Sequence, residues 1–451
     1  MLDHLLLIFA YHFPPENAIG GARPARFAKY LTRLGYTCRV ITAAPQTDSD
    51  ASVEYVPDPF RVQSKTDPRW QLERLIRKTV LPSEVGTQWS FRAAGAARRF
   101  LRANPAARVT VFSTFPPIGT HLAAWQLTRA RRWPWIADFR DPLAHEWALP
   151  FTNGFQKLVY RRLESGIARQ ADAVLTNTDA AGAAWIEKYP ALASKIHVLW
   201  NGFDPDDRIQ ALPIPQRDYQ VLSHVGELYL GRNATPILES IARLIGSGKL
   251  SAQAIRVRLV GSAESVCLPS AEFIRAATQQ GWLEIVNAQI AVRDARHIAQ
   301  TSDGLLLLHP HSSVQVPGKL FEYLQIGRPI LAFVQPTSPT ERILERSGVP
   351  YRCVYPDTSP DTVDETVAEF FAMSPLPVSS SAWFQRQFDA QSQTRDLDAL
   401  IRSVHSERQA PARSGESTPA ANQACLSPEL GQAEAAPDLT LGTGYKVPHR
   451  W

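Results

Sequence analysis

Short apolar runs alternate with amphipathic segments along most of this chain, and the alternation occurs twice. In the first half, strand-like runs begin near Leu5, Arg39, Val109, Trp135, Ala173 and Ile196. In the second half, they occupy residues 221–225, 257–260, 283–286, 305–308, 330–334 and 351–354. This alternation is typical of parallel sheets covered by helices on both faces. We therefore expect an α/β protein with two Rossmann-like parallel-sheet domains, whose strands meet a shared cleft at their carboxyl ends.

Helices are expected between these strands, together with one irregular segment. The predicted helices are 23–34, closed by Gly35, and 118–130, 235–245, 270–278, 293–300, 318–326 and 382–404. Residues 46–90 contain prolines and charges with few apolar repeats, so they are expected to form an irregular excursion near the site.

Composition places the domain boundaries. The N-terminal domain is predicted over residues 1–204, and Pro205, Pro213 and Pro215 indicate a linker over 205–216. The C-terminal domain is predicted over 217–381. The helix 382–404 follows it and is a candidate to pack back on the first domain. Residues 405–451 are rich in Ala, Pro, Ser, Glu and Gln, which predicts a disordered tail.

Length, charge and cysteine content narrow the class of protein. A chain of 451 residues is too long for one ordinary core, and its formal net charge of +5 supports no claim of nucleic-acid binding. The four cysteines at 38, 267, 353 and 425 have neither zinc-site nor disulfide-framework spacing, which suits a reducing cytoplasm. The apolar run 5–10 is too short to span a bilayer and follows Asp3 rather than a basic region, so a first buried strand is expected rather than a signal peptide.

A short helix near residue 320 has the strongest functional signal. Gly318 begins it, and Lys319 and Glu322 lie three residues apart, so both side chains share one face. The helix N-terminus supplies N–H groups and a positive dipole end, where phosphate often binds. Lys319 would contact a diphosphate, while Glu322 would accept from ribose hydroxyls. The alternative is a solvated i,i+3 ion pair between the two side chains.

Several further motifs precede this helix along the chain. They are Phe13-Pro-Pro-Glu16 with Gly20-Gly21-Ala22-Arg23-Pro24, Ala137-Asp138-Phe139-Arg140-Asp141-Pro142, 171–177, Trp200-Asn201-Gly202-Phe203-Asp204, and Gly226-Glu227 with Gly231-Arg232-Asn233. Together with the Lys319/Glu322 helix, they occur in the order found in glycosyltransferases of the GT-B fold, in particular family 4, and the chain resembles that family over residues 4–400. The resemblance implies a retaining enzyme that uses a nucleotide-diphosphate sugar as donor.

The family pattern implies roles for individual residues. Donor binding is expected from Gly20, Gly21, Gly226, Arg232, Gly318, Lys319 and Glu322, and catalytic roles from Asp141, Arg232 and Lys319. Asp138, Arg140 and His145 are expected on the acceptor or sugar side. Gly20 and Gly21 would take positive φ and bring the backbone close to phosphate or sugar. For Asp138, Arg140 and Asp141, the alternative is a structural ion-pair cluster, and for Arg232 it is a surface arginine.

The chain also departs from the family pattern. Val314 stands where the family has the first of two glutamates, and Glu227 stands where an arginine is frequent. The family contacts the donor sugar through that first glutamate, so the sugar stays open. A histidine found after the strand ending near Ala137 is absent, and His145 is a weak substitute.

These features predict a hexosyltransferase that needs neither a cofactor nor a metal, because Arg232, Lys319 and helix N-termini would stabilise the leaving diphosphate. Its partners would be a nucleotide-sugar donor and a glycan or lipid-linked acceptor, in surface polysaccharide or glycoconjugate biosynthesis, with no nucleic acid. Basic segments at 92–102, 129–135 and 157–169 suggest a cytoplasmic enzyme peripheral to an anionic membrane, or simply solvated helix faces. Two alternatives are a non-catalytic nucleotide-sugar-binding protein and a GT-B-fold sugar-nucleotide epimerase.

Overall fold

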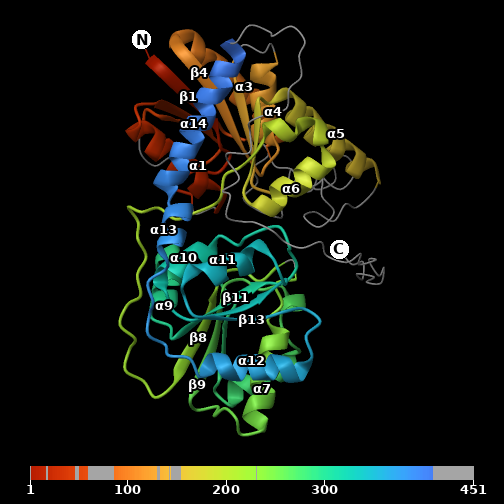
Figure 1. Cartoon of the computed structure of the whole chain (residues 1–451), viewed down its shortest axis with the longest axis vertical. Helices are drawn as coiled ribbons and strands as arrows, with labels where there is room; N and C mark the ends of the chain where they lie inside the picture. The colour runs from red at the N-terminus through yellow and green to blue at the C-terminus, as the bar shows by residue number, and fades with distance from the viewer. Residues whose placement is uncertain are drawn as a thin grey trace. The chain divides into compact units, whose positions relative to one another are not determined.

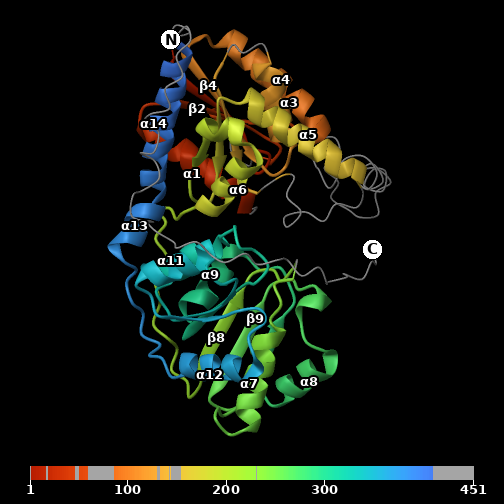
Figure 2. The same cartoon turned by 45° about the vertical axis from the view of Figure 1, so that its right-hand side comes forward.

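Two parallel sheets organise the chain (Figures 1 and 2). The structure is a computed structural model, and it describes residues 2–16, 19–45, 50–58, 86–129, 133–141, 143, 154–229 and 231–409. The predicted tail lies outside these residues from 410 onward, although its first residues, 405–409, are helical.

The first sheet has seven parallel strands in the order β3-β2-β1-β4-β5-β6-β7. They are β1 (Leu2–Phe9), β2 (Thr37–Thr42), β3 (Val53–Tyr55), β4 (Ala106–Phe115), β5 (Trp135–Phe139), β6 (Ala173–Thr176) and β7 (Ile196–Val198). Each predicted strand start of the first half lies in one of these strands. The short edge strand β3 falls within the segment predicted to be irregular, where 46–49 and 59–85 lie outside the described residues. Its three residues are only partly buried or exposed, so they lack an apolar run.

Helices cover both faces of the first sheet. One face packs on α3 (Thr87–Ala103), α4 (Gly119–Thr128), α5 (Gly154–Gln170) and α6 (Asp179–Lys188), which is followed by the 3-10 helix η1 (Pro190–Lys195). The other face packs on α1 (Ile19–Arg33) and on the C-terminal helix α14 (Ala390–Gln409). Leu397, Ile401 and Val404 of α14 are buried in that second core, beside α1 (Figures 1 and 2).

The second sheet has six parallel strands in the order β10-β9-β8-β11-β12-β13. They are β8 (Gln220–Val225), β9 (Ile255–Val260), β10 (Leu283–Val286), β11 (Gly304–His309), β12 (Ile330–Val334) and β13 (Tyr351–Val354). One face packs on α7 (Thr235–Gly246), the 3-10 helix η2 (Ser265–Cys267), α8 (Ala271–Gln279) and α12 (Pro360–Phe371). The other packs on α9 (Val292–Gln300), α10 (Lys319–Ile326), α11 (Pro339–Ser347) and α13 (Ala382–Phe388). All six strands predicted for this half are confirmed.

Both sheets have the strand order of a doubly wound fold, with a topological switch point. In the first sheet β1 lies beside β4, and in the second β8 lies beside β11. The chain leaves the two central strands in opposite directions, so the loops at their carboxyl ends diverge and leave room for a ligand. The fold therefore confirms the predicted α/β architecture and indicates where ligands bind.

The predicted helix 382–404 is two helices, because the chain breaks at Asp389. The backbone of Asp389 is extended, and its Oδ1 accepts a hydrogen bond from the backbone N–H of Gln391 at 2.6 Å, which caps α14. The predicted start of the first helix at Arg23 was also wrong. α1 begins at Ile19, which places Pro24 inside the helix.

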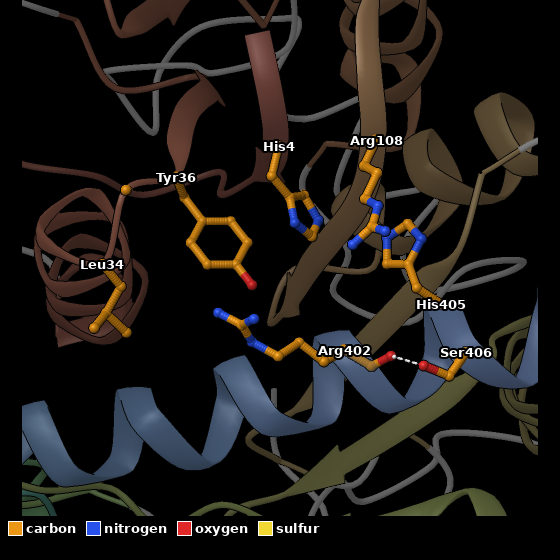
Figure 3. Close-up of a pocket in the computed structure, with 8 residues that line it drawn as sticks. His4, Leu34, Tyr36, Arg108, Arg402, His405 and Ser406 are labelled. Atoms are coloured by element: carbon orange, nitrogen blue, oxygen red, sulfur yellow. Dashed lines mark hydrogen bonds between the residues drawn. The ribbon is translucent and has the colours of Figure 1, made fainter.

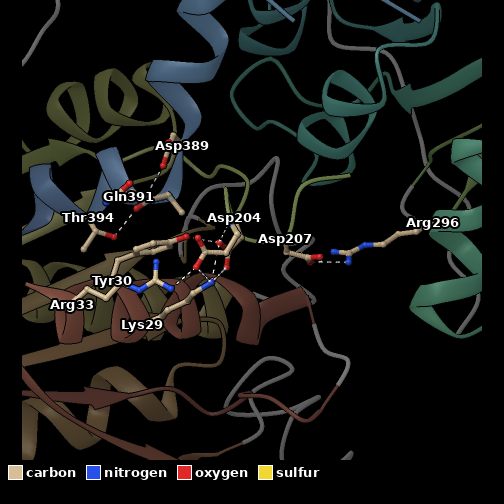
Figure 4. Close-up of polar contacts among 11 residues, drawn as sticks. Lys29, Tyr30, Arg33, Asp204, Asp207, Arg296, Asp389, Gln391 and Thr394 are labelled. Carbon is tan, nitrogen blue, oxygen red and sulfur yellow. Dashed lines mark hydrogen bonds and ion pairs between the residues drawn. The ribbon is translucent and has the colours of Figure 1, made fainter. Parts of the chain in front are cut away.

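The chain passes between the two sheets twice, and the two crossings touch. Phe203 donates its N–H to the carbonyl of Phe388 at 3.0 Å, and its own carbonyl accepts from Ala390 N at 2.9 Å. A Cβ at Gly202 would lie 2.0 Å from the Phe388 oxygen, so only glycine fits there. Asp204 accepts hydrogen bonds from Lys29 and Tyr30 of α1 (Figure 4).

Past Asp204, the predicted linker runs along the second sheet's helices. Asp207 pairs with Arg296 of α9 at 2.9 Å (Figure 4), and Ile209 is buried in the α9–α11 core. The domain boundaries 1–204, 205–216 and 217–381 stay a prediction.

Candidate functional site

Lys319 lies at the carboxyl end of the second sheet, beside its switch point. It is the first residue of α10, and its Nζ is 3.1 Å from Nε2 of His224 on β8. Gly226, directly after β8, has φ 129°, and a Cβ there would lie 2.6 Å from Lys319 Nζ. The backbone conformation favours glycine here, and any side chain would displace the end of Lys319.

The positive charge of Lys319 is poorly compensated. Burial and then the charge of Arg232 lower the pKa of Lys319 to about 7, although Glu322 and Glu227 act in the opposite sense. His224 Nδ1 contacts the backbone oxygen of Leu306 at 2.9 Å, and burial together with Lys319 lowers the pKa of His224 well below its ordinary value. A neutral imidazole therefore neighbours the ammonium group.

Arg232 lies near Lys319, as the resemblance implies. Its guanidinium stacks 4.3 Å from the ring centroid of Tyr229, which fixes its plane. After burial, Arg232 is the largest influence on the pKa of His309 at the end of β11, which falls to about 3. Within the described part of the chain, Arg232 has no carboxylate at ion-pair distance. Two cations and two neutral imidazoles therefore share this end of the sheet.

Glu322 does not pair with Lys319 on the helix; it binds Arg296 of α9 instead. The Nη2–Oε1 distance is 3.2 Å, and the Glu322 side chain is 41% exposed. Its carboxylate still raises the pKa of Lys319, so both groups remain near one another. Gly318 precedes Lys319 and is exposed, and its Cβ position meets open space.

Asp138 and Arg23 form a fully buried ion pair at the carboxyl end of the first sheet. Arg23 Nη2 and Nε donate to the two Asp138 oxygens at 3.0 and 3.1 Å, and Thr114 Oγ1 donates to Oδ2 at 2.8 Å. Arg23 also donates to the carbonyls of Leu199 and Trp200, both at 2.7 Å. Asp138 thus lies in the structural ion-pair cluster named as the alternative, and its acceptor-side role stays a prediction.

Arg140 and Asp141 follow β5 at the same end of the sheet. Arg140 donates to the carbonyls of Phe115 and Pro116 at 2.9 and 3.0 Å, and burial lowers its pKa. Burial raises the pKa of the Asp141 carboxyl, which the charges of Arg140 and Arg232 oppose. Asp141 Oδ1 accepts from Nε2 of Gln315 at 2.6 Å.

Gln315 belongs to the segment between β11 and α10, so its hydrogen bond joins the ends of the two sheets. Beside it, the carbonyl of Val314 accepts from Thr178 Oγ1 at 2.5 Å. Asp141 of the first sheet and Arg232 and Lys319 of the second are therefore neighbours in one site.

Gly20 and Gly21 differ from the prediction. They lie in the first turn of α1, and neither has a positive φ. Their missing side chains matter for packing within the protein. A Cβ at Gly20 would lie 3.1 Å from Arg140 Nη2, and one at Gly21 would lie 3.0 Å from Phe13 Cα. Their contribution to donor binding stays a prediction, and His145 lies outside the described residues.

Four residues of the site were missed by the sequence analysis: Arg23, His224, His309 and Gln315. His224 and His309 had a detectable signal, because each is a polar residue at the end of a long apolar strand beside the switch point. Arg23 was quoted only as part of the Gly20–Pro24 motif, and Gln315 had no signal, since the partners of both lie more than a hundred residues away. No group of three or more His, Cys, Asp or Glu among the described residues could hold a metal ion.

Comparisons with known proteins bear on the family and the fold of the chain. Residues 23–207 match the model of Glycosyltransferase Family 4. No curated protein sequence is significantly similar to the chain.

Solved structures give the fold. WaaG, a glycosyltransferase involved in lipopolysaccharide biosynthesis, is 17% identical with a TM-score of 0.53, covering 90% of this chain and all of that one. Anabaena Alr3699/HepE, solved with UDP-glucose, is 14% identical with a TM-score of 0.51, covering 88% and 99%. An α,α-trehalose-phosphate synthase (UDP-forming) from Burkholderia vietnamiensis is 11% identical with a TM-score of 0.58, covering 91% and 99%.

The chain has the two-sheet fold of the GT-B glycosyltransferases, and part of its first half matches the family 4 model. The predicted resemblance to family 4 is confirmed by the match over residues 23–207 and by the two-sheet architecture.

Proposed function

We propose that this glycosyltransferase transfers a hexosyl unit from a nucleotide-diphosphate sugar to a glycan or lipid-linked acceptor, with retention at the anomeric carbon. Surface polysaccharide or glycoconjugate biosynthesis is the process that we propose. The observation that carries the proposal is the pair of cations, Arg232 and Lys319, at the switch point of the second sheet. A diphosphate would compensate both charges and raise the depressed pKa of Lys319.

The proposed chemistry follows from the position of each group. Arg232 and Lys319 would stabilise the diphosphate as it leaves an oxocarbenium-like centre, which is the main electrostatic demand of the reaction. Glu322, which is partly exposed, would accept from the ribose hydroxyls. Asp141 would contact the sugar or the acceptor, and it would first have to exchange its hydrogen bond from Gln315. The acceptor hydroxyl would attack from the face that the phosphate leaves. We propose no cofactor and no metal.

A thermal-shift panel of UDP-, GDP-, ADP- and CDP-sugars tests donor binding, because a ligand that binds only the folded state raises its melting temperature. One class of nucleotide sugar should raise it, and Lys319→Ala should abolish the shift. A panel with no shift for any donor would contradict the proposal.

A non-catalytic nucleotide-sugar-binding protein is the second candidate, favoured by Val314 in place of the family's glutamate. A transfer or donor-hydrolysis assay separates the two. Release of nucleoside diphosphate, lost in Lys319→Ala and reduced in Glu322→Gln, supports the transferase. Tight donor binding without turnover supports the binding protein.

Association with an anionic membrane, from the cytoplasmic side, forms part of the proposal. On α3, Phe91 is 65% exposed beside Arg92, and on α5, Phe155 and Leu158 are 57% and 47% exposed near Arg161. These helices lie in the layer on one face of the first sheet (Figure 2). None of the described helices is long and apolar enough to cross a bilayer.

Exposed aromatic and aliphatic side chains among arginines suit an interfacial contact. Co-sedimentation with phosphatidylglycerol vesicles at low salt tests it. Binding should weaken with salt and in Phe91→Ser, whereas no binding at low salt would contradict the membrane contact.

A further inference from the structure

A cavity of about 340 Å³ lies at the edge of the first sheet opposite the candidate site (Figure 3). His4 lies near the amino end of β1, Arg108 near the amino end of β4, and Tyr36 directly before β2. Because these strands are parallel neighbours, their amino ends meet at one edge, while Arg140 and Asp141 follow the carboxyl ends. The cavity is therefore separate from the donor site.

The C-terminal helix α14 forms the other wall of this cavity. Arg402 and His405 point from α14 toward His4, Tyr36 and Arg108 (Figure 3). Thr110 Oγ1 links the two imidazoles, since it lies 3.2 Å from His4 Nε2 and 2.9 Å from His405 Nε2. The cavity therefore exists only while α14 is packed against the first sheet.

The charges around the cavity do not balance. Arg402 pairs with Asp398, which also accepts from the Tyr36 hydroxyl at 2.5 Å, and Arg408 pairs with Asp172 at 2.8 Å. Arg108, by contrast, is exposed and has no ion-pair partner among the described residues. Its guanidinium therefore leaves a surplus of positive charge, and two imidazoles whose protonation an anion would favour lie beside it.

The geometry points to a binding site for the phosphate group of a small phosphorylated molecule, held between α14 and the amino ends of β1 and β4. The guanidinium fork of Arg108 and two imidazoles approach from different directions, which suits the several oxygens of a phosphate. The volume exceeds that of one phosphate, and Leu34 supplies an apolar wall for the rest of the molecule. A bound anion would tie α14 to the sheet.

Binding should be coupled to proton uptake. Burial, followed by the charges of His405, Arg108 and Arg402, lowers the pKa of His4 to about 4, and Asp398 opposes this. Burial, with Arg108 and Arg408, also lowers the pKa of His405 against the influence of Asp172. Both rings are thus largely neutral in the free protein. An anion favours their protonated forms, so affinity should rise as the pH falls.

The test is calorimetric titration of the full chain with pyrophosphate. It is carried out in a Lys319→Ala background, which removes a cation of the proposed donor site. Arg108→Ala should weaken binding about tenfold or more, the usual effect of losing a charge-assisted hydrogen bond. The matched control Arg275→Ala removes an exposed arginine of α8, on the second sheet, and should leave affinity unchanged. Equal affinity in Arg108→Ala and Arg275→Ala would overturn the inference.

Two further measurements distinguish a phosphate site from nonspecific attraction of anions to a basic surface. Sulfate keeps its charge between pH 6 and 8, so it should bind more tightly at pH 6, and His405→Gln should reduce that difference. Hydrogen exchange in α14 should slow when pyrophosphate is bound, and no such change should occur in Arg108→Ala. Binding to phosphatidylglycerol vesicles through Arg108, without binding of soluble pyrophosphate, would assign the surface to lipid and overturn the inference.

Discussion

Charged side chains at the carboxyl end of the first sheet are paired with each other, whereas those at the carboxyl end of the second sheet are not. At the first sheet, Arg23 and Asp138 are 3% and 0% exposed, and each satisfies the other with support from Thr114 and two carbonyls. At the second sheet, Arg232 and Lys319 have no comparable partner among the described residues, and burial together with the charge of Arg232 lowers the pKa of Lys319. Charged residues at equivalent ends of two similar sheets are thus paired within the fold in one case and left without a carboxylate at ion-pair distance in the other, among the described residues.

The largest expected effect concerns Asp138, at the carboxyl end of the first sheet. Asp138→Asn should lower the free energy of unfolding by about 3–5 kcal/mol, because it leaves Arg23 charged and buried. Urea denaturation measures this loss. As control, Asp364→Asn removes the partner of Arg243, which is 42% exposed, and should cost about 1 kcal/mol or less. Unchanged stability with lost activity in Asp138→Asn would instead place Asp138 on the substrate.

At the carboxyl end of the second sheet, we expect a loss of activity without a loss of stability. Lys319→Ala should lower kcat/KM about 10²–10³-fold, the usual effect of removing one group that stabilises developing charge. Stability should not fall, because the substitution removes a charge that Arg232 repels. Steady-state kinetics and urea denaturation give both quantities, with exposed Lys249→Ala as the control. A large loss of stability in Lys319→Ala would show that Lys319 stabilises the fold, as Asp138 does.

The pH dependence of donor binding tests whether the protonated form of Lys319 binds the diphosphate. Free Lys319 loses its proton as the pH rises through about 7, and a diphosphate should bind the protonated form. The affinity for the preferred nucleoside diphosphate should therefore fall by up to about tenfold per pH unit above 7. Lys319→Arg keeps its charge and should flatten the profile. A flat profile in the unsubstituted protein would show that Lys319 does not bind the diphosphate.

The smallest effect is expected at Glu322. Glu322→Gln should raise KM for the donor about tenfold, as expected for a weakened hydrogen bond to a charged acceptor, with little change in stability. Asp207→Asn is the matched control, because Asp207 is the other carboxylate bound to Arg296. An equal rise in KM for both variants would mean that Glu322 acts only by holding Arg296.

The sequence predicted the features that depend on local pattern. Apolar runs such as 305–308 revealed the strands, and the Lys319 helix was found from its start at Gly318. The break at Asp389 and the helical position of Gly20 and Gly21 were missed, because both depend on neighbours distant in sequence. The pairing of Arg23 with Asp138 spans 115 positions, and only the assembled sheet brings the two together. The proposed roles of Asp141, Arg232, Lys319 and Glu322 stay predictions until the donor is known.

The contact between Phe203 and the segment around Asp389 has a mechanical consequence. Two sheets joined by one chain segment could twist and bend relative to each other in any direction. Two connecting segments that are hydrogen-bonded to each other at one point allow fewer relative motions. A relative rotation of the two sheets that kept the hydrogen bonds of Phe203 with Phe388 and Ala390 would turn about this point. Gly202, whose lack of a side chain permits the close contact with Phe388, would then lie at the pivot.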